Sequence, residues 1–246
     1  MKKQIQEMSP KEIEHLQTLK LDDTFSFTCK ACGKCCKNRE DIILTPFDVF
    51  RIAGYLGRTP EEIITRYCKV YEGQDSHFPI VWLAPLPPDN SCPFLRNKKC
   101  IVHTAKPVVC RVYPLARIFQ ASGCSKYYLN GSSCCHEPKL VTVREWLGDV
   151  AAEESERAGR LWTDGLMCLL SAIHPEKLSC SEAERNEILL NVFRCLWLPY
   201  DINAAFTPQL ERNLHFLRKY LQKHFDVKVP QTEDFLQSLK GEPYEQ

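Results

Sequence analysis

Four cysteines lie within eight residues near the start of the chain, at Cys29, Cys32, Cys35 and Cys36. The first three are each separated by two residues, a spacing that lets a tight turn direct successive sulfur atoms at one small inorganic centre. The thiolate is the form of cysteine that binds metals and acts as a nucleophile. This segment therefore predicts metal or redox chemistry.

A second set of cysteines follows at Cys92, Cys100 and Cys110, with Cys134 further along the chain. With the first four they make eight thiols, enough for two four-ligand sites or for one site plus a redox pair. Structural zinc sites usually have two C-x2-C pairs, and the second set contains none. A C-x2-C-x2-C triple completed by a distant Cys-Pro, here Cys92-Pro93, resembles the ligation of bacterial ferredoxins. The spacing therefore favours an iron–sulfur cluster, of the 4Fe–4S type, over zinc.

The adjacent pair Cys35 and Cys36 complicates a single centre. Neighbouring side chains point to opposite faces when the backbone is extended. Two metal-binding neighbours would then serve two centres, whereas a single ligand would leave the other thiol to pack as a small apolar side chain. The residues alone leave both arrangements open.

Basic residues alternate with these cysteines, and nearby cations lower the pKa of a thiol. They are Lys30, Lys34, Lys37 and Arg39 around the first set, and Lys98, Lys99 and Arg111 around the second. Arg111 and Tyr113, which follow Cys110, could donate hydrogen bonds to ligand sulfurs. Solvated surface loops are also rich in lysine, so this pattern supports metal binding only weakly.

Composition excludes some classes of function. The 246 residues carry 14 cysteines and a formal net charge of +1, so no global charge favours nucleic acid or a membrane surface. No apolar run approaches the ~20 residues of a membrane-spanning helix, and no signal peptide is recognisable. We therefore expect a cytoplasmic protein, in which many cysteines indicate metal or redox chemistry and not disulfides. The common nucleotide-binding, zinc-protease and serine-hydrolase motifs are absent.

Helix starts are marked by capping boxes, in which a Ser or Thr precedes an acidic residue by three positions. They begin at Ser9, Thr59, Thr142 and Ser181, and Thr45 begins a close variant with proline at the first helical position. We predict helices at 9–20, 46–56, 60–72, 143–173, 181–197, 207–225 and 232–240, with a break in 143–173 at Gly159 or Gly165. Strands are predicted near 25–27, 41–44 and 78–84, and a hairpin over 117–129 with its tip at Ser122-Gly123.

The sequence thus predicts an α+β fold with two consecutive parts. Residues 20–141 form a small cysteine-rich, metal-binding module with short strands, and residues 142–246 form an all-helical C-terminal module. The helical module could offer a surface to a protein partner. Four isolated cysteines are expected to pack in the interior and not to bind metal. They are Cys68, Cys168, Cys180 and Cys195.

Several sequence pieces recur together in a known family. They are Phe27-Thr28-Cys29 through Cys36, Leu44-Thr45 with Asp48, Cys92-Pro93-Phe94-Leu95, Cys100 through Pro114, Lys126-Tyr127-Tyr128-Leu129, Cys134 and Val141-Thr142-Val143. By their order and spacing, from about Phe25 to Leu147, the chain resembles the CxxCxxCC cysteine-cluster (YkgJ-like) family of zinc- or iron-chelating domains. The resemblance implies a metal or cluster site built from the eight cysteines, Cys29, Cys32, Cys35, Cys36, Cys92, Cys100, Cys110 and Cys134.

The same resemblance leaves three functions open. The first is a metal-binding protein that holds an iron–sulfur cluster or zinc. The second is a cluster-dependent protein lysine methyltransferase or redox enzyme, because the flagellin lysine N-methylases have a similar cysteine signature; they are longer, and their first cysteines are spaced differently. The third is a structural zinc module for protein interaction.

The chain departs from the family's usual pattern at two places. Cys134-Cys135-His136 stands where the family often has Cys-Pro-Gly, and His103 stands where it often has tyrosine. The sequence leaves open whether Cys124, Cys135, His103 or His136 binds metal.

Overall fold

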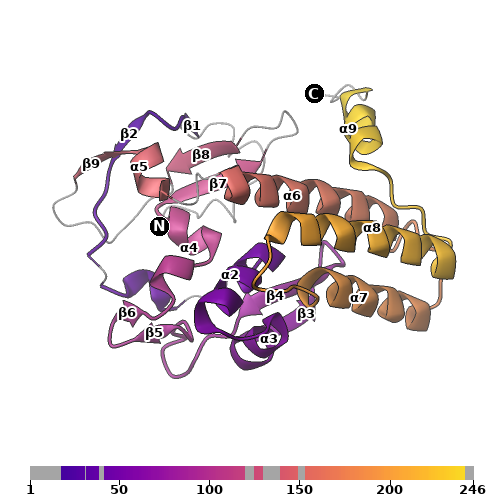
Figure 1. The fold of residues 1–246 in the computed structure, drawn as a ribbon, viewed down its shortest axis with the longest axis horizontal. Helices are drawn as coiled ribbons and strands as arrows, with labels where there is room; N and C mark the ends of the chain where they lie inside the picture. The colour runs from indigo at the N-terminus through magenta and orange to yellow at the C-terminus, as the bar shows by residue number, and fades with distance from the viewer. Residues whose placement is uncertain are drawn as a thin grey trace. The chain divides into compact units, whose positions relative to one another are not determined.

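The computed structural model describes residues 18–30, 32–38, 42–119, 125–129, 139–148 and 153–241. They form an α+β fold of short strands in small sheets and longer helices (Figure 1). After β9 (Leu140–Thr142), every described element is a helix. The predicted fold class is confirmed. None of the described helices combines the length and the apolar character needed to cross a membrane.

The chain packs as two compact units that interleave in sequence. The first contains residues 1–43 and 83–156, and the second contains residues 44–82 and 157–246. Segment 44–82 thus packs with the C-terminal helices, although it lies between the two sets of cysteines in the sequence. These units say which parts of the chain pack together and do not define functional domains. The predicted domains, 20–141 and 142–246, therefore stay a prediction.

The first unit is built from short elements. They are β1 (Thr18–Leu19), β2 (Thr24–Ser26), the 3-10 helix η2 (Lys34–Cys36), β5 (Leu95–Arg96), β6 (Lys99–Cys100), the 3-10 helix η3 (His103–Ala105), α4 (Val108–Val112), β7 (Leu115–Phe119), β8 (Ser125–Leu129), β9 and α5 (Val143–Leu147). The strands pair antiparallel as β1-β8-β7, β2-β9 and β5-β6.

Alternation of side chains along β2 builds the core of this unit. Phe25 faces inward opposite Val141 of β9, and Phe27 continues on the same side. Both phenylalanines are buried, in a cluster that also includes Val112, Val143 and residues of β1, β7, β8 and α5. The core therefore lies directly beside the segment that begins at Cys29.

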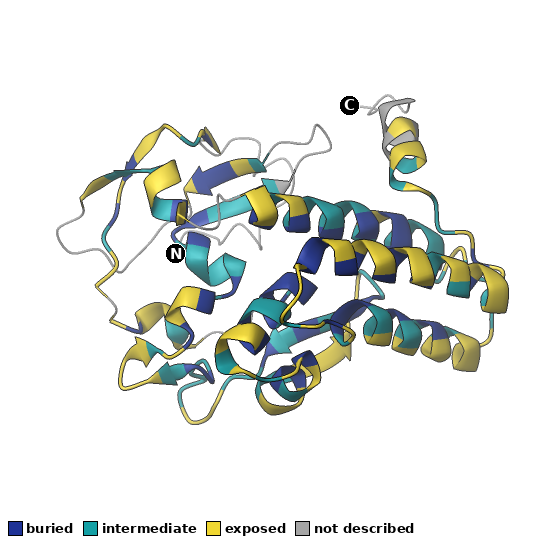
Figure 2. Cartoon of the chain, in the orientation of Figure 1, coloured by how far each residue is buried: buried dark blue, intermediate teal, exposed yellow. Residues whose placement is uncertain are grey.

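The second unit is mainly helical. Its elements are α2 (Pro46–Leu56), α3 (Pro60–Tyr67), β3 (Cys68–Glu72), β4 (Pro79–Leu83), most of α6 (Glu153–Ile173), α7 (Glu182–Trp197), α8 (Phe206–Phe225) and α9 (Thr232–Gly241). Along α8 the buried residues recur every three or four positions, and the opposite face is exposed (Figure 2). Phe78, Trp162 and Trp197 pack at ring-centroid distances of 5.2–6.4 Å and anchor the interior.

The two ends of segment 44–82 lie side by side. Leu83 N donates a hydrogen bond to Ile42 O at 2.9 Å, and Leu44 N donates to Val81 O at 2.7 Å. Because of these bonds, the residues that precede and follow the segment, Ile42 and Leu83, are neighbours.

Most predicted boundaries are confirmed. The capping boxes at Thr45, Thr59, Thr142 and Ser181 all form, with both hydrogen bonds present. The predicted 117–129 hairpin forms as β7 and β8, and its tip lies outside the described residues.

Three helix predictions are wrong in part. The helix predicted over 60–72 ends at Tyr67, because Cys68–Glu72 pairs with β4 and its Tyr71 packs on Trp82 at 6.1 Å. The 143–173 stretch is interrupted after Leu147, where Gly148 takes φ +52°, and not at Gly159 or Gly165. Residues 18–19 of the predicted 9–20 helix form β1, and the remaining part up to residue 17 lies outside the described residues.

Candidate metal centre

A left-handed glycine makes the turn that carries the first thiols. Gly33 has φ +71° and precedes the 3-10 helix η2, and Cys36 N donates to Gly33 O at 3.1 Å. A Cβ at this position would lie 3.3 Å from Leu95 Cδ1 and 3.5 Å from Lys98 O. Glycine is therefore favoured both by the backbone conformation and by the close approach of the second cysteine segment.

Backbone hydrogen bonds bring the second set of thiols to the first. Cys92 N donates to Cys36 O at 2.7 Å, and the β5-β6 hairpin places Cys100 opposite Leu95. Cys110 lies in α4, with its N–H bonded to Pro107 O at 2.9 Å. Residues more than fifty positions apart in sequence thus meet around one place.

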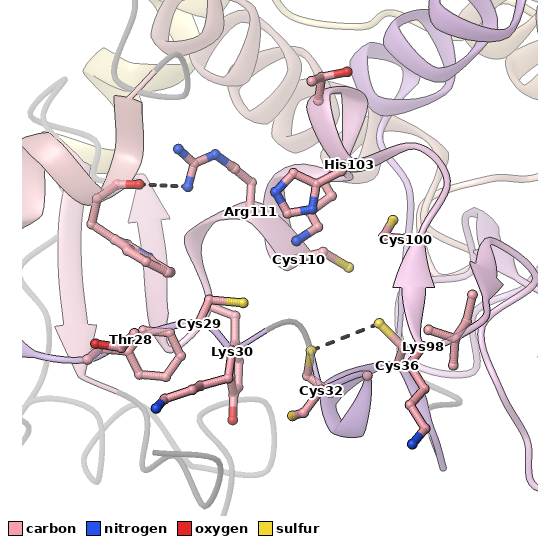
Figure 3. Close-up of a pocket in the computed structure, with 18 of the residues that line it drawn as sticks. Thr28, Cys29, Lys30, Cys32, Cys36, Lys98, Cys100, His103, Cys110 and Arg111 are labelled. Carbon is pink, nitrogen blue, oxygen red and sulfur yellow. Dashed lines mark hydrogen bonds between the residues drawn. The ribbon is translucent and has the colours of Figure 1, made fainter. Parts of the chain in front are cut away.

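Two adjoining cavities are lined by these cysteines. The smaller, of about 40 Å³, is lined by Cys35, Cys36, Cys92, Cys100 and Cys110, and its other walls are mostly apolar. The larger, of about 530 Å³, shares four of these thiols and adds Cys29 and Cys32. Figure 3 shows the labelled sulfur atoms of Cys29, Cys36, Cys100 and Cys110 around the larger pocket.

Seven of the eight predicted ligands thus line one or both cavities. The eighth, Cys134, lies outside the described residues, as do Cys124, Cys135 and His136. The assignment of all eight as ligands stays a prediction. His103 lines the larger pocket, where burial and then the charges of Lys106 and Arg111 lower the pKa of its imidazole.

The adjacent thiols do not diverge as expected for an extended backbone. Cys35 and Cys36 lie in the 3-10 helix, and their Sγ atoms are 3.9 Å apart. Two thiolates on one tetrahedral ion with metal–sulfur bonds of about 2.3 Å would be about 3.8 Å apart. The pair therefore has the separation of two ligands of the same ion.

The other thiols are not gathered as closely. Among the described residues, no group of three or more His, Cys, Asp or Glu side chains is arranged to hold a metal ion as it stands. The smaller cavity is thus surrounded by donors of the right chemistry, with one pair at ligand spacing.

The surroundings of three of these thiols, Cys36, Cys92 and Cys100, raise their pKa values and so favour the neutral form. The hydrogen bond with Cys35 and then burial raise the pKa of Cys36, and the nearby Cys35, Cys92 and Cys110 add to the effect. Burial is also the main cause that raises the pKa of Cys92 and of Cys100. A metal that binds these sulfurs must displace their protons.

The remaining described cysteines belong to the second unit and line neither cavity. Cys168 is fully buried in α6, as predicted for a packing residue. Burial raises the pKa of the Cys68 thiol to about 12, which makes it a poor nucleophile and a poor ligand. Cys180 and Cys195 are half-buried.

Sequence reasoning missed part of the lining of the larger pocket, namely Trp146 and Lys106. Trp146 belongs to α5, and Phe27 and Tyr113 line the same pocket. Lys106-Pro107 directly precedes the helix that contains Cys110, and this closeness in sequence could have indicated that Lys106 lies near the thiols. Trp146 lies more than thirty residues from any described ligand candidate, so only the fold could bring it there.

Comparison with protein families identifies this part of the chain. Residues 28–136 match the CxxCxxCC family. The family is described as a "putative zinc- or iron-chelating domain". The match covers somewhat less than half of the chain and confirms the resemblance inferred from the cysteine pattern; it supports metal binding and does not distinguish zinc from iron.

A curated relative is similar to part of the chain. It is an uncharacterized protein of Methanocaldococcus jannaschii, 30% identical over 91 residues, which are 36% of this chain and 44% of that protein. The chain thus spans less than half the length of the relative. No solved structure matches the chain.

Proposed function

We propose that the CxxCxxCC region binds zinc or iron through thiolates, with Cys35 and Cys36 on one metal ion. The observation that carries this proposal is the 3.9 Å separation of their sulfur atoms at the edge of a cysteine-lined cavity. Cys92, Cys100 and Cys110 line the same cavity and are the candidates for the remaining ligands. When bound, the ion would cross-link two segments of chain and so stabilise the first unit.

The geometry bears on the type of centre. Four cysteines hold a 4Fe–4S cluster, one for each iron, so two thiolates on one ion do not suit it. They suit a single zinc or iron ion, or a 2Fe–2S cluster in which each iron takes two thiolates. A single ion or a 2Fe–2S cluster therefore suits this pair better than the 4Fe–4S centre that the spacing alone favoured.

The test is metal analysis of protein purified without oxygen. Zinc or iron near one equivalent, without acid-labile sulfide, is the expected result for a single ion; two equivalents each of iron and labile sulfide would indicate the 2Fe–2S form. Four equivalents of both would overturn the shared-ion geometry. Protein that retains no metal and takes up neither zinc nor iron on reconstitution would overturn the proposal as a whole.

An enzyme is the second candidate, because a pocket of about 530 Å³ adjoins the thiols and is large enough for a small-molecule substrate. Its lining does not favour a lysine methyltransferase. Lys30, Lys98, Lys106 and Arg111 would repel the ammonium group of a substrate lysine. A redox or small-molecule reaction is more consistent with this charge.

Protein interaction through the helices stays a proposal of its own. Phe216, on the outward face of α8, is 56% exposed, and such a side chain is typical of interaction surfaces. Binding of a partner that Phe216→Ser weakens, without loss of helical content, would support it.

A further inference from the structure

The larger pocket has an aromatic wall on a fixed frame. This wall consists of Phe27, Tyr113 and Trp146. Phe27 packs edge-on against Trp146 at 4.9 Å and against Tyr113 at 6.1 Å between ring centroids. Trp146 Nε1 donates to Val112 O at 3.1 Å, which fixes the indole. A flat apolar molecule would find a preformed surface there.

A group of three basic side chains lies beside this wall. Arg111 Nη1 donates to Trp146 O at 2.6 Å, and its guanidinium carbon is 5.9 Å from the centroid of the Trp146 ring. Figure 3 shows Arg111 and His103 next to each other in the pocket. His103 is also close enough to Lys106 and Arg111 for both charges to lower its pKa. The basic group, His103, Lys106 and Arg111, therefore converges on one part of the pocket.

The guanidinium group of Arg111 is closely surrounded by the end of α5. A Cβ on Gly148 would lie 2.9 Å from Arg111 Nη2, and Gly148 takes φ +52°. The guanidinium is thus seated against a glycine that ends α5. A guanidinium held in this way offers the pocket a positive charge at a fixed place, which suits a carboxylate or phosphate.

The overall charge of the lining points the same way. Lys30, Lys98, Lys106 and Arg111 bring four permanent positive charges, and Glu145 is the one carboxylate among the described lining residues. Its Oε2 already accepts hydrogen bonds from Thr142 N and Oγ1, both at 2.9 Å. A divalent ion with four thiolates carries two negative charges, so the pocket keeps a positive charge even beside a loaded centre.

We propose that this pocket binds a small organic oxyanion, a carboxylate or a phosphate monoester, whose flat apolar part lies on the aromatic wall and whose charged group lies at Lys106 and Arg111. Cys100 and Cys110 line the same pocket, so the bound molecule would lie next to the thiols. The inference rests on the proposed metal centre only for that last relationship. The binding itself uses the aromatic wall and the basic group.

The test is calorimetric titration of the purified full chain, at constant ionic strength, with three probes that share one ring. Benzoate and phenyl phosphate represent the two sources of the oxyanion, and benzylamine is their cationic counterpart. We expect at least one anion to bind with a Kd at or below about 1 mM. The stronger of the two anions identifies the source, and benzylamine should not bind.

Variants locate the site. Lys106→Met should raise the Kd of the anion at least tenfold. Lys99 is an exposed lysine on β6 outside the pocket, and Lys99→Met should leave the Kd within twofold. Arg111→Lys keeps the charge and loses the planar fork, and it should also weaken binding. Circular dichroism checks each fold, and Arg111→Lys provides the test if Lys106→Met does not fold.

The outcomes separate this inference from the metal centre. Protein that carries metal and binds neither anion overturns the inference alone, as does equal binding by benzylamine or an unchanged Kd in both pocket variants. Protein without metal that binds an anion, with the expected loss in Lys106→Met, supports the pocket and counts against the proposed function.

Discussion

The Sγ atoms of Cys35 and Cys36 lie 3.9 Å apart on one turn of 3-10 helix, and both thiols line the same two cavities. If one ion takes both sulfurs, Cys35→Ser and Cys36→Ser should each lower the bound metal to less than half of the wild-type stoichiometry, because a serine hydroxyl is a poor ligand for zinc or iron at neutral pH. Metal analysis of the purified variants measures this.

Cys195→Ser is the matched control, since that thiol is half-buried in α7 and lines neither cavity. It should keep the full metal content. Retention of metal by both Cys35→Ser and Cys36→Ser would show that the pair does not share an ion.

Metal affinity should rise with pH. The pKa values of Cys36, Cys92 and Cys100 are raised, so these thiols carry protons in the metal-free protein throughout the neutral range. Binding releases one proton for each thiol that becomes a ligand, and the association constant therefore increases about tenfold per pH unit for each such thiol between about pH 6 and pH 8.

Competition against a chelator of known proton affinity measures this slope. Fewer protons should be released by a Cys36→Ser variant that still binds metal. An association constant for the metal that does not change over this range would mean that the thiols with raised pKa values are not ligands.

The first unit should depend strongly on Glu156, at the start of α6. Its carboxylate accepts hydrogen bonds from Arg117 Nη1 at 3.1 Å, Ser125 Oγ at 2.7 Å and Tyr127 Oη at 2.9 Å, and the Arg117 side chain is only 7% exposed. Glu156→Ala removes the carboxylate that faces a buried cation, so we expect it to lower the free energy of unfolding by roughly 2–3 kcal/mol.

Urea unfolding measures that loss, and Glu211→Ala is its control. Glu211 pairs with Arg157 at 3.1 Å, but both side chains are about half exposed, so this variant should lose less than about 1 kcal/mol. Equal losses in the two variants would contradict a special role for the Glu156 network.

Two helical glycines should respond in opposite directions to alanine. A Cβ on Gly165 of α6 would lie 2.9 Å from Leu214 Cδ1, and Leu214 is buried, so Gly165→Ala should destabilise the second unit by about 1 kcal/mol. A Cβ on Gly54 of α2 would meet no atom of the described residues within 4 Å beyond its own helical turn, so Gly54→Ala should stabilise by about 0.5–1 kcal/mol. Thermal unfolding of both variants tests the pair, and a stabilised Gly165→Ala protein would contradict the close packing of α6 on α8.

Local signals predicted the helices well where local interactions decide them. The side chain–backbone bonds at Thr45 and Ser181 need only residues within three positions, and both form as expected. The same reasoning wrongly extended a helix over Cys68–Glu72. This segment pairs with β4, and that pairing depends on residues outside the local sequence. Gly165 shows the reverse case: the space that it leaves is filled by Leu214, so the helix continues through it.

The site divides in the same way. The cysteine pattern and the family resemblance indicated eight thiols; seven of them line the cavities, and the eighth, Cys134, lies outside the described residues. The pattern could not indicate that Cys35 and Cys36 lie on a helical turn, which brings their sulfurs together. Nor could it place Trp146 in the same pocket as the thiols, since that position depends on α4 packing beside α5 in the folded unit.

The hydrogen bonds at Ile42–Leu83 and Leu44–Val81 make segment 44–82 begin and end at a single place on the backbone. Loops within such a segment can change length at little extra entropic cost while its two ends stay paired. Residues added to the loops of segment 44–82 therefore need not displace Ile42 and Leu83, which line the smaller cavity.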